Sequence, residues 1–226
     1  MGRSRLHELA ARSHPDRGGH RGAASVTAMP GFVIPFHGAG GKTRLDSLGE
    51  RGRALIAHAM AIDVARACAS LGPVLIVAPV DPGIVGTTFV ADPGGGQGAA
   101  VAAGLAAKVE RFGDDTAVVV NADLPCVTTD DIEELLAALP GHALAYVPAA
   151  DGTTNALAFA NANTFAPLYG AGSASRFAAL GSSIAVSPTN LIDDVDTPND
   201  LERLANRLGS ATRAALAELR ALGVAA

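Results

Sequence analysis

Short apolar runs alternate with longer, periodic stretches rich in alanine and leucine, and this alternation constrains the fold more than any other feature of the chain. The short runs end at glycine, proline or aspartate, as strands do, whereas the longer stretches have helical spacing. Residues 116–120 form a valine-rich run, which is typical of a central strand buried on both faces. The sequence therefore predicts an α/β fold with a mostly parallel sheet between layers of helices.

The expected elements follow from this alternation. Strands are expected over residues 32–36, 74–78, 88–91, 116–120, 144–147, 156–159 and 183–186. Helices are expected over residues 50–71, 97–112, 129–139, 173–180, 199–208 and 211–222. Gly72 is placed to end the first helix as a left-handed cap. The strands that flank residues 151–155 are so close in sequence that an antiparallel pair is expected there.

Length and composition fit one ordered domain, because 226 residues with 49% hydrophobic and 17% charged side chains can bury a full core. The apolar runs are too short to span a bilayer, and no stretch has the layout of a secretory signal. We therefore expect a cytoplasmic protein with no membrane partner. Cys68 and Cys126 lack metal-ligand spacing; Cys68 is expected in the core, and neither supports a disulfide framework or a nucleophile.

The net charge of −5 is unevenly distributed. Residues 1–30 hold five arginines against Glu8 and Asp16, so the rest of the chain is strongly acidic and a poor candidate for nucleic-acid binding. We interpret residues 1–30 as a flexible basic leader or the product of a start codon assigned too early, with Met29 as the alternative start. The predicted domain covers residues 31–226.

A glycine-rich loop, GAGGKTR at residues 38–44, directly follows the first expected strand. Consecutive glycines let backbone N–H groups wrap a polyphosphate, and a cation in the same loop neutralises its charge. Lys42 is one of two lysines in a chain with fifteen arginines, which favours a specific role for it. The alternative is an ordinary surface loop with solvated cations.

The same loop almost matches the P-loop pattern GxxxxGK[ST]. Gly41, Lys42 and Thr43 fit the end of the pattern, but Phe36 stands where its first glycine is required. That turn places backbone directly against phosphate, so a P-loop kinase is the weaker interpretation.

Aspartates follow two of the later strands. Asp123 lies in the ADLP segment just after the central strand, and Asp194 and Asp196 share one side of the chain if residues 193–198 are extended. Carboxylates this close repel one another unless a cation bridges them, and hard oxygen ligands suit Mg²⁺. The alternative is a helix-capping cluster, because Thr197 and Pro198 also fit a helix start.

Two further loops, at residues 151–155 and 169–176, supply hydroxyl groups and backbone N–H groups. The second adds Arg176 at the opening of a helix, where a phosphate or a carboxylate could bind. Each loop taken alone is an ordinary turn.

The succession of segments along the chain resembles the family of 2-phospho-L-lactate and phosphoenolpyruvate guanylyltransferases of coenzyme F-420 biosynthesis. The segments that carry the resemblance are GKTRL, ADLP, DGTTNAL, YGAGS and DVDTPNDL, and it extends over residues 33–201. It implies a three-layer α/β/α nucleotidyltransferase domain, Rossmann-like and GT-A-like, with a mixed, mostly parallel sheet. It also implies transfer of GMP from GTP to 2-phospho-L-lactate, phosphoenolpyruvate or 3-phosphoglycerate, with release of pyrophosphate.

The resemblance also implies roles for individual residues. Lys42, Arg44 and Asp123 would be catalytic. The nucleotide would be bound by Gly40, Gly41, Lys42, Gln97 and Gly98, and the acceptor by Thr153, Thr154, Gly170 and Ser173. Mg²⁺ would be held by Asp123, Asp194 and Asp196. A homodimer is compatible with the sequence, which does not fix the oligomeric state.

The chain departs from the family pattern at two places, which keeps other functions open. His37 stands where the family usually has lysine, in a loop about one residue shorter, and Gln97-Gly98 replaces a Leu-Asn pair. The alternatives are a sister nucleotidyltransferase acting on a molybdopterin or sugar phosphate, and a nucleotide-binding paralogue without activity.

Overall fold

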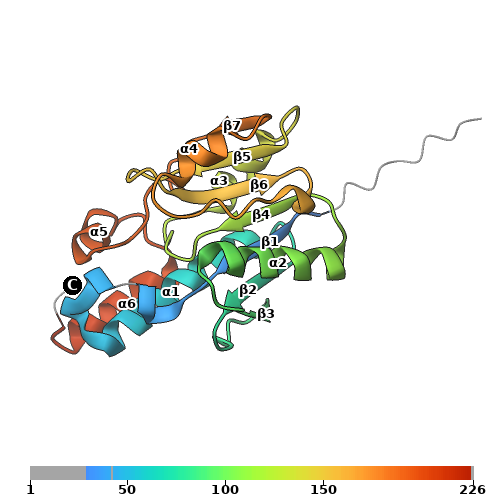
Figure 1. Ribbon diagram of the computed structural model, residues 1–226. Helices are drawn as coiled ribbons and strands as arrows, with labels where there is room; N and C mark the ends of the chain where they lie inside the picture. The colour runs from blue at the N-terminus through green and yellow to red at the C-terminus, as the bar shows by residue number, and fades with distance from the viewer. Residues whose placement is uncertain (1–28, 42, 225–226) are drawn as a thin grey trace, which may run out of the picture.

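The computed structural model describes residues 29–41 and 43–224, which build one mixed sheet of seven strands in the order β3-β2-β1-β4-β6-β5-β7 (Figure 1). The strands are β1 (Gly31–Pro35), β2 (Val74–Ala78), β3 (Thr87–Ala91), β4 (Ala117–Val120), β5 (Leu144–Pro148), β6 (Thr154–Phe159) and β7 (Ser183–Ala185). β1 pairs in parallel with β2 and β4, β2 with β3, and β5 with β7. β6 runs antiparallel to both β4 and β5. This arrangement confirms the mostly parallel sheet and the antiparallel pair expected around residues 151–155.

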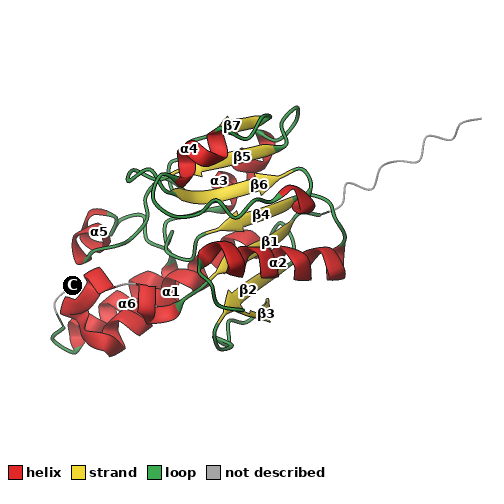
Figure 2. Ribbon diagram, viewed as in Figure 1, coloured by secondary structure: helices red, strands yellow, loops and turns green. Residues whose placement is uncertain are grey.

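The helices lie on both faces of the sheet, as Figure 2 shows. They are α1 (Gly49–Ala69), α2 (Gln97–Phe112), α3 (Thr129–Ala137), α4 (Ser173–Ala178), α5 (Pro198–Arg203) and α6 (Ser210–Ala221), with short 3-10 helices η1 (Gly38–Gly41), η2 (Thr43–Leu48) and η3 (Ala162–Thr164). None of the helices in the described part of the chain is long and apolar enough to cross a membrane.

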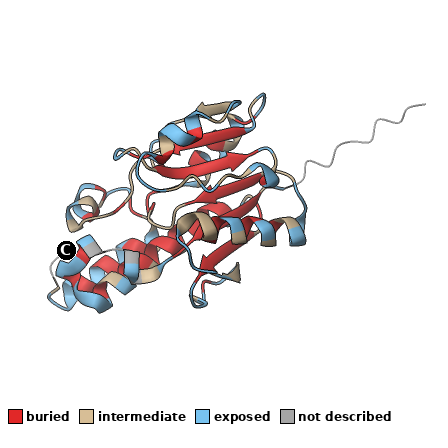
Figure 3. Cartoon of the chain, viewed as in Figure 1, coloured by how far each residue is buried: buried red, intermediate tan, exposed pale blue. Residues whose placement is uncertain are grey.

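Alternation of side chains along the strands divides the core between the two faces. Phe32 and Ile34 of β1 pack in one cluster with α1 and α3, whereas Val33 packs in another with α2 and α4. The strand residues of the central sheet are buried in Figure 3. The sandwich of helix, sheet and helix is therefore a three-layer α/β/α fold, as predicted.

A third cluster joins α6 to α1 beyond the edge of the sheet, where Figure 1 shows the two helices side by side. The buried carboxylate of Asp63 in α1 accepts hydrogen bonds from the backbone N–H groups of Ala211 and Thr212 at 3.0 and 2.8 Å. Gly209 is required here because a Cβ would lie 2.2 Å from the Asp63 carboxyl carbon.

Close packing at Gly104 and the buried side chain of Lys108 set the position of α2. A Cβ on Gly104 would lie 2.4 Å from Val33 Cγ1, so the helix approaches the sheet where a larger residue could not. The fully buried Lys108 donates to the carbonyls of Gly113 and Asp115 at 2.8 and 3.1 Å and pairs with the Asp115 carboxylate. One of the two lysines therefore has a structural role.

Some element boundaries differ from those expected. The helix expected over 199–208 is only α5, and α3 and α4 each end two residues early. The segment expected as an irregular loop after β1 contains η1 and η2. Gly72 is not a left-handed cap, because the C-cap of α1 is Ser70, which has a right-handed conformation. Glycine is needed at position 72 because a Cβ there would lie 2.0 Å from the Pro30 carbonyl oxygen. The interpretation of the basic leader falls almost entirely outside the described residues.

Candidate active site

A cavity of about 390 Å³ opens where loops at one end of the sheet meet. Its walls come from the end of β1 and the loop after it, one face of α1, the start of α2, the segment after β4, the β5–β6 hairpin, the loop before α4 and the segment before α5. In a largely parallel sheet, loops at the carboxyl ends of the strands converge in this way, and ligands bind there.

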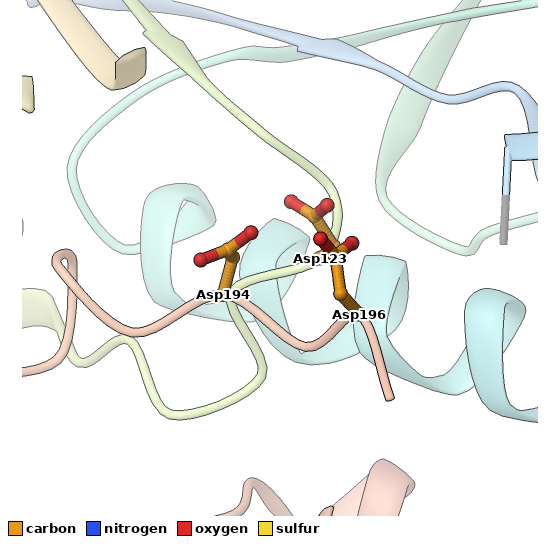
Figure 4. Close-up of side chains that lie close together, drawn as sticks. All are labelled: Asp123, Asp194 and Asp196. Carbon is orange, nitrogen blue, oxygen red and sulfur yellow. The ribbon is translucent and has the colours of Figure 1, made fainter. Parts of the chain in front are cut away.

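Three aspartates meet in this cavity, and Figure 4 shows their carboxylates converging from two chain segments. Each of Asp123, Asp194 and Asp196 offers an oxygen within 4.8 Å of the other two. The two segments are tied together because Val195 N–H donates to the Asp123 carbonyl at 3.0 Å. The Val195 side chain is buried in the cluster of α1 and α6, so its two neighbours point the other way, as the extended segment predicts.

The capping alternative applies to neighbouring residues. Thr197 is the N-cap of α5, Pro198 follows it at the first helical position, and Asp200 completes a capping box. Burial alone would raise the pKa of Asp200, but hydrogen bonds from Thr197 and Arg203 outweigh it and hold the pKa below its usual range. Because Thr197 and Asp200 cap the helix, Asp194 and Asp196 are left to line the cavity.

The donor set of these three aspartates fits a hard divalent cation, since it consists of carboxylate oxygens that repel one another without a counter-charge. Arg44 supplies a positive charge at its edge: its Nη1 lies 3.0 Å from Asp196 Oδ2, while 72% of its side chain stays exposed. The structure therefore brings Arg44 next to the triad of Asp123, Asp194 and Asp196.

The start of the glycine-rich loop reaches the cavity. His37 and Gly38 line the cavity, whereas Gly40, which like Gly41 belongs to η1, is not among the described lining residues. Lys42 lies outside the described residues, so its predicted role stays a prediction.

His37 contacts a buried carboxylate that the sequence did not single out. His37 Nδ1 lies 3.3 Å from Asp92 Oδ2, and Asp92 Oδ1 accepts a hydrogen bond from Gly94 N–H at 2.8 Å. An aspartate before Pro-Gly-Gly-Gly is typical of a turn, so only the strand order, which brings the ends of β1 and β3 to one edge, could have indicated this contact.

Gln97 lines the cavity and is linked to the opposite wall through Asn121. Gln97 Nε2 donates to Asn121 Oδ1 at 2.7 Å, and Asn121 Nδ2 donates to the Thr154 carbonyl at 3.1 Å. Gly98 lies instead against Pro167, where a Cβ would approach the proline Cβ to 2.9 Å. Packing explains the glycine at that position.

The two loops predicted to bind the acceptor form one wall. Thr154 and Ser173 are buried, and their hydroxyl oxygens lie 2.9 Å apart. Asp151 Oδ1 accepts from the backbone and the hydroxyl of Thr153, and these hydrogen bonds hold the pKa of Asp151 below its usual range. Gly170 has a φ of +106°, a conformation suited to glycine, and its carbonyl accepts from Ser173 N–H at 2.9 Å.

Arg176, which the sequence suggested for anion binding, instead stabilises the loop of this wall through hydrogen bonds to its backbone. Its guanidinium donates to the backbone carbonyls of four successive residues at 2.7–3.3 Å, namely Leu168, Tyr169, Gly170 and Ala171. The arginine is absent from the described cavity lining and shapes the loop that carries Gly170.

Cys126 is buried beside the site without forming part of its lining. Burial raises the pKa of its thiol to about 11, so it is neutral at physiological pH. A neutral, buried thiol has no nucleophilic role.

Comparison with known protein families gives one domain assignment. The MobA-like NTP transferase domain matches residues 40–185, a span that contains residues 40–44 of the glycine-rich loop, Asp123 and both loops of the predicted acceptor wall.

Two relatives named as guanylyltransferases match most of the chain. Phosphoenolpyruvate guanylyltransferase from Streptomyces coelicolor is 34% identical over 205 residues, which is 84% of this chain and 96% of that protein. 3-Phospho-D-glycerate guanylyltransferase from Phenylobacterium zucineum is 31% identical over 202 residues, 81% of this chain and 93% of that protein.

Among solved structures, a protein from Desulfovibrio desulfuricans G20 assigned to the nucleotide-diphospho-sugar transferases superposes with a TM-score of 0.65 at 21% identity. The match covers 85% of this chain and 96% of that chain. At this identity the likeness concerns the fold, which both proteins share.

Proposed function

Because this chain belongs to the MobA-like NTP transferases and, within them, to the family of the phosphoenolpyruvate guanylyltransferases, we propose that it transfers GMP from GTP to a small phosphorylated acid and releases pyrophosphate. The chain is a nucleotidyltransferase. The acceptor is phosphoenolpyruvate, 3-phosphoglycerate or 2-phospho-L-lactate, and the product feeds the cytoplasmic synthesis of coenzyme F-420. The names of the relatives support the first two acids.

The observation that carries the proposal is the lining of one cavity by three kinds of group. His37, Gly38 and Gln97 suit a nucleotide, and the triad of Asp123, Asp194 and Asp196 suits a cation. The wall that includes Thr153 and Gly170 suits a small anion. A transferase needs both substrates and the cation within reach of one phosphorus atom.

The triad would hold Mg²⁺, which when bound neutralises negative charge on the phosphates. Lys42 and Arg44 would contact the triphosphate, with the backbone N–H groups of Gly40 and Gly41 beside it. Gln97 and the neighbouring Gly98 would lie at the nucleobase end of the bound nucleotide.

The acceptor would rest on Thr153, Thr154, Gly170 and Ser173. Because the hydroxyl groups of Thr154 and Ser173 contact each other, these two residues contribute a rigid wall and their backbone rather than free hydroxyls. Gly170 brings backbone close to the ligand without a side chain in the way.

In the proposed reaction an oxygen of the acceptor's phosphate attacks the α-phosphorus of GTP in line. A bond forms between that oxygen and the α-phosphorus, the bond from the α-phosphorus to the oxygen bridging to the β-phosphorus breaks, and pyrophosphate leaves with the electron pair. The attacking phosphate is already ionised at neutral pH, so the chain needs no general base. Its residues act by positioning and by neutralising charge.

Product analysis tests this proposal. The protein is incubated with Mg²⁺, each of the four nucleoside triphosphates and each of the three acids, and products are identified by mass spectrometry. We expect pyrophosphate and one guanylylated acid from GTP alone. Release of GDP with a phosphorylated product would indicate a kinase instead. GTP binding without product, unchanged in His37→Lys, would indicate an inactive paralogue.

A further inference from the structure

Asp193, the residue just before the triad aspartate Asp194, lies in a network of salt bridges between acidic and basic side chains. We propose that Asp193, Arg203 and Arg207 are positioning residues that hold the segment carrying Asp194 and Asp196 in its cation-binding geometry. This inference rests on the cation site of the proposed function.

Both oxygens of the Asp193 carboxylate are used. Arg203 Nη1 donates to Asp193 Oδ1 at 2.7 Å, and Arg207 Nη2 donates to Asp193 Oδ2. Arg203 also donates to Asp200 Oδ1 at 3.1 Å, which joins Asp193 to the capping box of α5. The segment is therefore fixed from the side of α5.

The same network reaches a second helix. Arg207 Nη1 donates to Asn190 Oδ1 at 3.0 Å, and Asn190 Nδ2 donates to the carboxylate of Asp131, which belongs to the capping box of α3. The buried Asn155 donates to the Leu191 carbonyl at 3.0 Å. The segment is thus anchored at α3, β6 and α5.

Such anchoring is needed because three carboxylates with oxygens within 4.8 Å of one another repel, and the segment between Leu191 and Thr197 has no helix or strand of its own. The hydrogen bond and burial of Val195 fix its middle, and Asp193 fixes the end next to Asp194. Groups that orient ligands typically change metal affinity by about 10–100-fold when they are removed.

Electrostatics and positioning predict changes of opposite sign in metal affinity when one of the two arginines is removed. Arg203 and Arg207 are cations near a cation site, so removing one should strengthen metal binding if only charge mattered. If they position the ligands, removing one should weaken metal binding although a repelling charge is lost. The sign of the change separates the two effects.

The test measures direct binding of Mn²⁺ to the full chain, with electron paramagnetic resonance used to quantify the Mn²⁺ that remains free. We expect wild type to bind Mn²⁺ and Arg203→Gln and Arg207→Gln each to bind it about tenfold more weakly. Arg203→Lys should recover part of the loss. Arg66→Gln is the matched control, because it removes the same charge from an arginine paired with Ser210 and Asp63, and it should stay within about twofold of wild type.

A catalytic readout and melting temperatures complete the test. The Mg²⁺ concentration for half-maximal turnover should rise in Arg203→Gln and Arg207→Gln while kcat at saturating Mg²⁺ stays within about threefold of wild type. If Arg203→Gln does not fold, Arg207→Gln decides the sign. Unchanged or tighter Mn²⁺ binding in a folded variant overturns the positioning role alone, whereas a wild type that binds no Mn²⁺ overturns the cation site of the proposed function as well.

Discussion

The two walls of the cavity are built in opposite ways. On the glycine-rich wall, a Cβ added at Gly38 would meet no described atom within 4 Å, and Arg44, at the edge of the aspartate triad, is 72% exposed. On the wall opposite, Thr154 and Ser173 are buried and contact each other. The second wall is preformed, whereas the first leaves its groups available to a long, charged ligand. We call the glycine-rich wall the open wall and the wall of Thr154 and Ser173 the closed wall. Substitutions in the open wall should therefore alter kinetics alone, and substitutions in the closed wall should also alter stability.

The largest effect is expected where both walls meet the triad. Asp123→Ala removes a carboxylate of the cation site, and we expect turnover to fall by on the order of a hundred-fold or more. The fold should persist, because the variant also removes one of three mutually repelling charges. Steady-state pyrophosphate release and a thermal melt measure the two quantities; near-normal turnover would be incompatible with the proposed cation site.

A large effect without a stability change is expected in the open wall. Arg44→Ala should lower kcat/KM for GTP by roughly tenfold or more, since a charge that would contact phosphate is lost. The melting temperature should stay near that of wild type, because the Arg44 side chain is largely exposed where it pairs with Asp196. Arg51→Ala, at an exposed site on α1, is the control. Equal kcat/KM values for the two variants would remove Arg44 from the site.

The closed wall should respond in the free energy of unfolding. Thr154→Val leaves the buried Ser173 hydroxyl without its partner, which costs about 1–3 kcal/mol. We expect the KM for the acceptor to rise and the KM for GTP to stay nearly unchanged. Thr88→Val, on the edge strand β3, is a control of the same shape. Chemical denaturation of the three proteins compares their stability, and equal values would show that this wall is no more rigid than the other.

The smallest effect concerns Asp131, which joins α3 through Asn190 to the segment that carries Asp194 and Asp196. Burial alone would raise the pKa of Asp131, but hydrogen bonds from Thr128 and Asn190 outweigh it and hold the pKa below its usual value. This carboxylate therefore stabilises the fold above the unfolded-state pKa of about 3.9, and the contribution is lost as pH falls through the lower folded pKa. Asp131→Asn should lower the melting temperature at pH 7 and lower it less at pH 3. An equal decrease at both pH values would contradict this assignment.

The contrast between the walls also explains what the sequence could predict. The strands and most helices follow from local apolar patterns, and the triad follows from Asp123 after a strand and from two aspartates at alternate positions. Contacts made by packing between distant segments could not be found in that way. The pair of His37 with Asp92 and the close approach of Gly98 to Pro167 both depend on tertiary neighbours.

Arg176 shows the same limit for a charged residue. Its place at the opening of a helix indicated an anion site, yet its donors are taken by four backbone carbonyls of the preceding loop. Gly72 is similar, because the approach of Pro30 rather than a left-handed conformation requires glycine there. In each case the residue type was informative, and the partner was set by the fold.

The most direct test of the account is a matrix of initial rates of pyrophosphate release, with GTP varied at several fixed concentrations of phosphoenolpyruvate. If both substrates bind the two walls of one cavity and react directly, double-reciprocal plots should give intersecting lines. Parallel lines, together with recovery of guanylylated protein, would mean that GMP passes through a covalent intermediate on the chain. That result would contradict direct transfer between the two walls.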